Sequence, residues 1–100
     1  MGIFDIFHQT AKRPAPCSGG SGSSSDDAVV ITASTTPEGL LAEYAYLHYA
    51  CGLSNIDWTL EKQKVTTEKD RSYDVLVTKL VKTGETRTFW VDITEFFGKY

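Results

Sequence analysis

The composition of the chain changes at Thr36-Pro37, and this break constrains the fold more than any motif does. Residues 14–36 are rich in Ser, Gly and Asp and offer few side chains to bury. From Pro37 onward, apolar residues recur with the period of a helix and then with the period of strands. We therefore expect a short amphipathic apolar head at 1–13, a Gly/Ser-rich flexible linker at 14–36 and a small α+β domain at 37–100.

Length, charge and cysteine content narrow the functional classes. One hundred residues, of which 41% are hydrophobic, allow a single small domain. The net charge of −3 is spread over the front and the back of the chain, so neither part has the basic surface that nucleic-acid binding requires. Cys17 and Cys51 are too few and too far apart for a disulfide framework, which predicts reduced thiols in a cytoplasmic protein.

The apolar head begins with the sequence M-G-I-F-D-I-F, in which Ile3, Phe4, Ile6 and Phe7 fall on one face of a short helix. A helix of this length is marginal in water, so it forms only against a receiving surface. Three receivers remain open: the protein's own domain, a groove on a partner protein, or a membrane surface. Phe4 and Phe7 are therefore candidates for a protein contact.

Within the expected linker, residues 28–32 read Ala-Val-Val-Ile-Thr, a short β-prone segment. Its β-branched residues favour an extended conformation. The surrounding Ser and Gly residues favour flexible coil. Two interpretations stay open, namely coil and a weak edge strand.

The domain begins with a helix from about Pro37 to Cys51. Thr35 and Glu38 have the spacing of a capping box, and Gly52 is placed to end the helix in a left-handed conformation. These signals at both ends make the helix the best-defined element of the sequence.

The apolar residues of this helix predict which side faces the core. One stripe holds most of them: Leu40, Tyr44, Leu47 and Cys51. Tyr46 and Tyr49 then point to the opposite side. They either form a protein-binding patch or lie over the rim of the sheet or under the front segment.

Three strand-like runs follow the helix, at residues 56–61, Ser72–Val81 and Thr86–Ile93, and residues 66–71 form a polar loop. Phe96 and Phe97 fit a short helical turn near the last residues. The expected fold class is α+β: one helix packed on a three-stranded antiparallel meander, in the order α-β-β-β with the short C-terminal helical turn.

The register of the last two strands follows from their apolar pattern. A three-residue turn ending at Gly84 pairs Val77 with Phe89 in the core. It also places Leu76 opposite Trp90 on the outer face, where both are candidates for a protein contact. A two-residue turn would instead put a carboxylate on the core face.

This register sets Asp74 opposite Asp92, and like charges in that position are unfavourable. Three explanations remain open. A cation from Lys62 or Lys64 lies between them, the register is off by two residues, or the two acids form a functional site in which one pKa is raised. The third explanation corresponds to a small enzyme that uses Asp74 and Asp92.

The order helix, three strands, short helix, together with Leu40-Leu41-x-Glu-Tyr at the start of the helix, resembles double-stranded-RNA-binding domains. The resemblance covers about 60 residues and implies RNA binding. Those domains open their last helix with a basic G-x-x-x-K-K-x-x-A stretch that contacts phosphates. The matching residues 92–97 here are acidic, so this module would lack the usual basic motif.

Motifs for metals, cofactors and catalysis do not occur in the sequence. His48 and Cys51 lie on one helix, but no C-x-x-C or H-x-x-x-H pair completes a metal site, and no glycine-rich phosphate loop is present. We therefore expect no metal, no cofactor and no enzyme. The preferred function is a protein-interaction or regulatory protein, an adaptor or inhibitor, whose open sheet face is covered by a partner or by a second copy.

Overall fold

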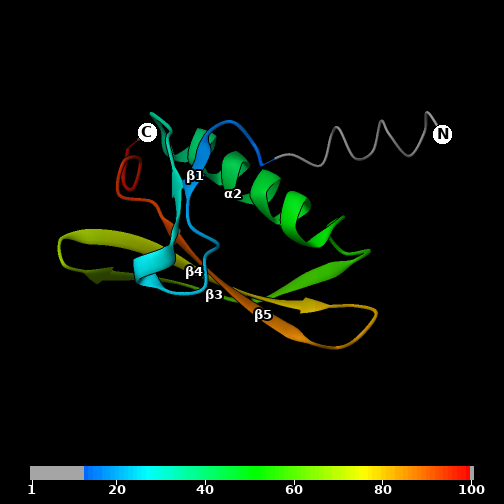
Figure 1. Ribbon diagram of the computed structural model, residues 1–100. Helices are drawn as coiled ribbons and strands as arrows, with labels where there is room; N and C mark the ends of the chain where they lie inside the picture. Colours follow the sequence, from blue (N-terminus) through cyan, green and yellow to red (C-terminus); the bar gives the residue numbers. More distant parts are fainter. Residues whose placement is uncertain (1–12, 100) are drawn as a thin grey trace.

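The computed structural model of the protein describes residues 13–99, and it confirms the α+β class. One helix, α2 (Thr36–Cys51), lies across a five-stranded mixed sheet (Figure 1). The strands are β1 (Cys17–Gly19), β2 (Val29–Ile31), β3 (Trp58–Glu68), β4 (Arg71–Leu80) and β5 (Thr86–Asp92), and a 3-10 turn, η1, spans Ser25–Asp27. Their order in the sheet is β1-β2-β5-β4-β3, so β3, β4 and β5 form the expected meander. We call the sheet face under α2 the inner face and the opposite one the outer face.

The expected three-stranded sheet gains two strands from the segment that the sequence predicted as a flexible linker. β1 pairs antiparallel with β2, and β2 pairs parallel with β5. Val29 and Ile31 are fully buried, because β2 lies in the interior of the sheet and directs both side chains into the core. The polar loop before β2 is also held in place, since Asp27 accepts hydrogen bonds from Ser21 and Ser23.

The predicted ends of α2 are confirmed. The Thr35 hydroxyl accepts a hydrogen bond from the backbone N–H of Glu38, at 3.4 Å. At the other end, the N–H of Gly52 donates to the carbonyl of His48, with a φ of 100° at Gly52. Only the side of the helix that faces the core differs from the prediction.

The buried side of α2 is rotated away from the predicted stripe. Leu40 and Tyr44 are 42% and 45% exposed, and the buried residues are Gly39, Ala42, Glu43, Tyr46 and Leu47. Small residues let the helix approach the core closely: a Cβ atom at Gly39 would lie 2.2 Å from the ring of Phe96. Close approach of the backbone therefore decides the helix orientation, more than the number of large apolar side chains on one stripe.

The register between β4 and β5 differs by one residue from the prediction. Val75 pairs with Trp90 and Leu76 pairs with Phe89. The connecting loop has four residues, because the N–H of Gly84 bonds back to the carbonyl of Leu80 with a φ of 73° at Gly84. The shift turns Leu76 onto the inner face, where it is 2% exposed.

The hairpin between β3 and β4 is longer than expected. Residues 66–68, predicted as loop, continue β3, and the turn consists of Lys69 and Asp70 alone. Both have positive φ values, 50° and 66°, as a two-residue hairpin turn requires. A β-bulge between Leu60 and Lys62 interrupts the pairing with β4.

After β5, residues 93–98 form hydrogen-bonded turns at the end of α2 where the helix begins (Figure 1). Phe96 is buried and closes this end of the core, whereas Phe97 is 52% exposed. Among residues 13–99, no helix has the length and apolar character needed to cross a membrane.

Candidate functional site

The residues that the sequence singled out do not gather at one place. Phe4 and Phe7 lie outside the described residues. Tyr49 is exposed, but Tyr46 is buried under the front segment. The Arg13 guanidinium lies 5.2 Å from the centre of the Tyr46 ring, a cation–π contact, and donates to its hydroxyl oxygen at 3.4 Å.

Asp74 and Asp92 lie on opposite faces of the sheet, because the one-residue shift separates them. Asp92 pairs with Tyr73 on the outer face, and Asp74 pairs with Val91 on the inner face. The expected contact between the two carboxylates, and a shared site built from them, therefore do not form. The other two explanations also fail. The register differs from the prediction by one residue and not by two, and the cation beside Asp92 is Arg71 and not Lys62 or Lys64.

Asp92 is neutralised on the outer face by an arginine and a hydroxyl. Arg71 Nε donates to Asp92 Oδ2 at 2.6 Å, and Thr94 donates to Oδ1 from both its hydroxyl and its N–H. Burial alone would raise the pKa of Asp92, but these hydrogen bonds outweigh it and the pKa is lowered. The carboxylate fixes the end of β5 to the start of β4, which is a structural role.

Asp74 faces a second buried acid that sequence reasoning missed. Glu43, on α2, is 3% exposed and Asp74 is 2% exposed. Gln63 Nε2 donates to Asp74 Oδ2 at 2.8 Å. Among the described residues, both carboxyl oxygens of Glu43 and Oδ1 of Asp74 receive no hydrogen bond, and neither acid forms an ion pair with Lys or Arg.

This arrangement requires a proton between the two acids. Two carboxylates buried together without a cation would be very costly, and one shared proton converts the repulsion into a hydrogen bond. Burial contributes most to raising the pKa of Glu43 to about 10, and the hydrogen bond that a protonated Glu43 can donate to Asp74, together with the charge of Asp74, adds to this effect. We refer to Glu43 and Asp74 as the acid pair.

The acid pair joins α2 to the sheet and is closed to solvent, so its position favours a structural role over catalysis. The sequence held one signal for it, an acidic residue between the buried positions of Ala42 and Tyr46 on the helix. Nearby, Cys17 is buried, and its Sγ lies 3.7 Å from the carbonyl of Ala42. Burial raises the pKa of the Cys17 thiol, which disfavours the reactive thiolate.

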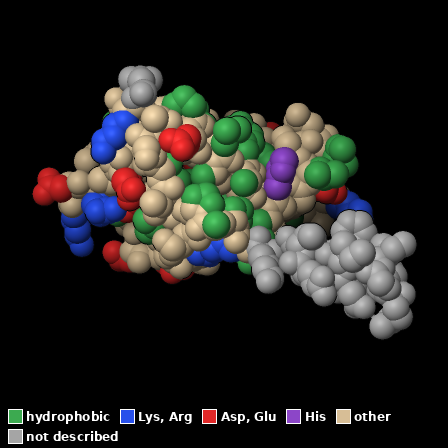
Figure 2. All heavy atoms as spheres, turned by 90° about the horizontal axis from the view of Figure 1, so that it is seen from above, with side chains coloured by type: hydrophobic (Ala, Val, Ile, Leu, Met, Phe, Trp, Pro, Cys, Tyr) green, Lys and Arg blue, Asp and Glu red, His purple; other side chains and the backbone are tan. Residues whose placement is uncertain are grey.

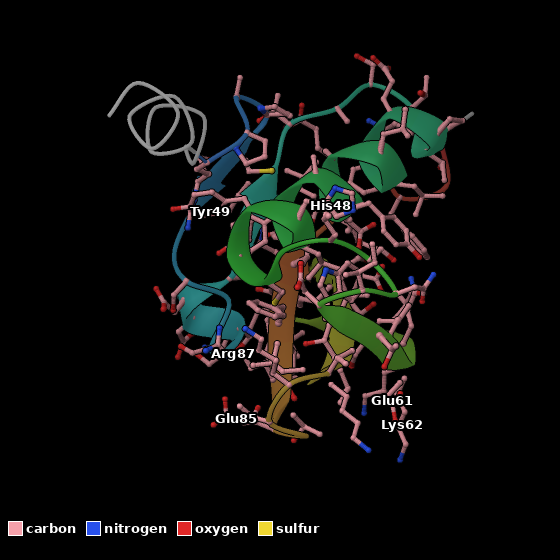
Figure 3. All side chains as sticks on the ribbon, turned by 90° about the vertical axis from the view of Figure 1, so that its right-hand side faces the viewer. His48, Tyr49, Glu61, Lys62, Glu85 and Arg87 are labelled. Atoms are coloured by element: carbon pink, nitrogen blue, oxygen red, sulfur yellow. The ribbon has the colours of Figure 1, made fainter. Side chains whose placement is uncertain are left out.

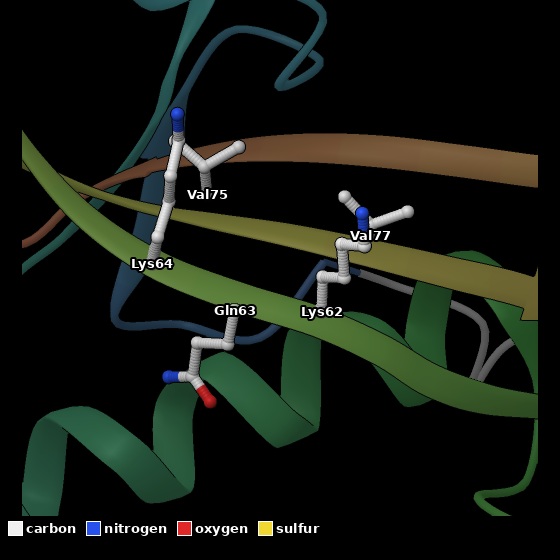
Figure 4. A pocket seen from close by; sticks show the side chains of 5 residues that line it. All are labelled: Lys62, Gln63, Lys64, Val75 and Val77. Atoms are coloured by element: carbon white, nitrogen blue, oxygen red, sulfur yellow. The ribbon is translucent and has the colours of Figure 1, made fainter.

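A pocket of about 500 Å³ lies on the outer face between β3 and β4. In Figure 4, Lys62 and Lys64 extend along the outer face beside Val77 and Val75, while Gln63 points from the same strand toward α2. Val75 is only 6% exposed, as expected where lysine stems lie along an apolar surface and hold their ammonium groups in water. We call this region the lysine pocket.

The outer face continues beyond the lysine pocket with an aromatic pair. The rings of Tyr73 and Trp90 meet edge to face, with centroids 5.7 Å apart. Trp90 is half-buried and Tyr73 is 7% exposed. Of the predicted contact residues, Trp90 therefore lies on the expected face, opposite the face that α2 covers.

A second apolar surface lies along the β3 side of α2. Tyr44 stacks on the ring of Trp58 in β3, and His48 meets the same ring edge to face. Figure 2, which looks onto the α2 side, shows hydrophobic side chains at the surface across its middle. Exposed apolar residues of α2 include Leu40, Leu41 and Tyr44, and Val65 of β3 is 48% exposed. Figure 3 places His48 toward β3 and Tyr49 away from it.

Metal ligands do not cluster in residues 13–99: no group of three His, Cys, Asp or Glu side chains is placed to hold an ion. The chain matches no known protein family, no curated protein and no solved structure. The order of elements also differs from the double-stranded-RNA-binding domains that the sequence resembled, because the sheet has five strands and residues 94–98 form turns instead of a helix.

Proposed function

We propose that this protein is a protein-binding module that receives an acidic segment of a partner protein on its outer sheet face. The observation that supports this proposal is the lysine pocket, which combines an apolar floor with two ammonium groups at its rim. Such a combination fits a segment in which acidic and apolar side chains alternate, because the alternate residues of an extended chain point in opposite directions.

The charge of the outer face favours an acidic partner. Lys79 shares this face with the two lysines of the pocket, since it lies an even number of residues from Val77 on β4. The buried acid of this face, Asp92, is already paired with Arg71 and Thr94. The lysine ammonium groups therefore remain available to carboxylates of a partner.

An apolar anchor would bind where the lysine stems now lie. Val75 and Val77 form the pocket floor, and Trp90 lies next to Val75 across the strand pair. An entering Leu or Val side chain displaces the flexible stems and removes the valine surface from water, which favours binding. The lysine ammonium groups then bond to the flanking acids.

The test is a binding measurement with a defined probe. A labelled peptide in which Glu and Leu alternate is titrated with the protein, and fluorescence anisotropy is recorded at low salt. We expect saturable binding that the double variant K62E/K64E weakens by at least about tenfold. Val77→Ser, which changes no charge, should weaken it about fivefold, because it removes part of the apolar floor.

Two controls separate this site from general charge attraction. The double variant K82E/K99E makes the same charge change at exposed positions away from the pocket, and should bind the peptide within about twofold of the natural protein. A peptide in which Lys and Leu alternate should not bind. Equal weakening by both double variants, or equal binding of both peptides, would refute the proposal.

A further inference from the structure

The sheet ends on one side in a long strand with a free edge. β3 has 11 residues, Trp58–Glu68, and within residues 13–99 it pairs with β4 alone. The opposite edge strand, β1, has only three residues. At the start of β3, Trp58 also forms an isolated bridge with Ser54 and its carbonyl accepts from the N–H of Asn55, so the open edge lies beyond Trp58. A long edge strand presents unpaired N–H and C=O groups that another strand can bind. Figure 3 shows Glu61 and Lys62 of β3 extending into solvent at this edge.

A second copy of the chain could pair with this edge in only a few registers. Two identical strands that pair antiparallel are related by a twofold axis perpendicular to the sheet. That axis keeps each sheet face on its own side, so an inner residue must lie opposite an inner residue. Between Lys62 and Glu68, inner and outer residues alternate, and the two residue numbers of a pair must therefore add up to an even number.

One of these registers matches the charges of β3. With Val65 opposite Val65 of the second copy, Lys62 lies opposite Glu68 and Gln63 opposite Thr67, twice each by symmetry. Both residues of the Lys62–Glu68 pair belong to the outer face. Opposite charges in directly facing positions stabilise a sheet.

The neighbouring registers are worse. If the strands slide so that Lys64 lies opposite Lys64, two like charges meet at the centre of the interface. If they slide the other way, to Thr66 opposite Thr66, the paired stretch shrinks to Lys64–Glu68. The charges therefore exclude the register centred on Lys64. In the register centred on Thr66, Lys64 also lies opposite Glu68, so the longer paired stretch is what favours the register centred on Val65.

The same register covers exposed apolar surface. Val65 is 48% exposed, and in this register it packs on its own copy across the axis. The axis also places both α2 helices on one side of the joined sheet. Leu40 and Tyr44, which are 42% and 45% exposed, lie on the β3 side of α2 and so face the second helix across the axis.

We propose that two copies of this protein associate through the β3 edge, with Val65 at the twofold axis and Lys62 opposite Glu68 of the second copy. The ten strands then form one continuous sheet. This proposal goes beyond the binding of an acidic segment, and it also affects that binding. Because Lys62 would serve both contacts, the acidic segment and the second copy weaken each other's binding by the same factor.

The experiment is sedimentation equilibrium of the full chain at low salt, with no peptide present. We expect a concentration-dependent dimer in the natural protein. Glu68→Lys sets Lys62 opposite a lysine at two symmetric places and should weaken the dimer by at least about tenfold. The swapped variant K62E/E68K restores opposite charges and should bring the dimer back to within about threefold of the natural protein.

A further variant checks the register. Lys64 lies opposite Thr66 in the proposed dimer, so Lys64→Gln should leave association within about twofold. In the register centred on Lys64, the same change would strengthen the dimer. Far-ultraviolet circular dichroism verifies that each variant is folded. Two results would overturn the proposal. In the first, the natural protein stays monomeric at about 500 µM, a concentration hundreds of times higher than a micromolar dissociation constant. In the second, the swapped variant does not recover the dimer.

Discussion

The inner and outer faces of the sheet both bury a carboxylate, and they neutralise it in opposite ways. On the outer face, Asp92 keeps its negative charge and is paired with Arg71 and Thr94. On the inner face, Asp74 meets Glu43, and a proton takes the place of the missing cation. The pKa of Asp92 is lowered, and the pKa of Glu43 is raised.

This difference has consequences for stability at different pH values. A carboxyl with a lowered pKa stabilises the fold at neutral pH and loses that contribution in acid. A carboxyl with a raised pKa stabilises the fold in acid and loses that contribution as pH rises through its folded pKa. Two buried carboxyl groups therefore make the outer face sensitive to acid and the inner face sensitive to alkali.

The largest expected effect comes from Glu43→Gln. Between the ordinary pKa of 4.5 and the folded value of about 10, the natural protein must bind a proton to fold. Its free energy of unfolding therefore falls with rising pH in this range, by about 1.4 kcal/mol per pH unit from this group. Gln carries a permanent donor for Asp74, so the variant should be more stable by about 3 kcal/mol at pH 7. Urea unfolding from pH 5 to pH 9 measures both the slope of the free energy of unfolding against pH and the difference in that free energy between the variant and the natural protein.

An exposed acid supplies the matched control for this change. Glu61→Gln alters the same chemical group in solvent at the β3 edge and should change the free energy of unfolding by less than about 0.5 kcal/mol at every pH. If Glu43→Gln leaves the slope of stability against pH as steep as in the natural protein, the two acids do not share a proton.

The next largest effect is expected on the outer face, from Asp92→Asn. This substitution removes the charge that Arg71 and Thr94 bind, and should cost about 2 kcal/mol at pH 7. The cost should become smaller as the pH falls below the ordinary pKa of 3.8 toward the lowered pKa of Asp92, because the unfolded chain of the natural protein then takes up a proton before the folded chain does. Denaturant unfolding at pH 7 and pH 3 makes the comparison, with Asp70→Asn in the exposed hairpin turn as the control. A cost that is equal at both pH values would contradict the charge-based account of Asp92.

The smallest of the three effects is expected from Trp90→Leu, also on the outer face. The change removes the edge-to-face contact with Tyr73 and should cost about 1 kcal/mol. Unlike the effect of Glu43→Gln, which changes with pH over this range, the cost of Trp90→Leu should be the same from pH 5 to pH 9. Thermal unfolding at pH 5 and pH 9 measures this cost. A cost that differs between the two pH values would show that Trp90 is coupled to neighbouring ionisable groups.

Local signals explain which parts of the fold could be predicted from the sequence. The ends of α2 depend on Thr35, Glu38 and Gly52, all of which act within one turn of the helix. The meander depends on alternation within each strand. Which side of α2 is buried was not predictable in this way. It depends on the close approach of Gly39 to Phe96, and these two residues lie far apart in the sequence.

The candidate site was predictable to a smaller extent, for the same physical reason. Trp90 was assigned to the outer face, but Leu76 was assigned there too and lies on the inner face. A single extra residue in the loop before Glu85 moves every pair of β4 and β5 by one position. The acid pair depends on the helix orientation and the strand register together, so neither pattern alone indicates it.

The parallel pairing of β2 with β5 gives the protein a characteristic order of assembly during synthesis. Val29 pairs with Val91, and these residues lie 62 positions apart along the chain (91 − 29). On a ribosome, β2 therefore emerges long before its partner strand exists, and contacts of such high sequence separation form late. Val29 and Ile31, which are fully buried in the folded protein, therefore stay exposed to solvent until β5 has been made. The residues on their N-terminal side are rich in Ser and Gly, and such polar, flanking segments oppose aggregation of an exposed β-prone segment while the rest of the domain is made.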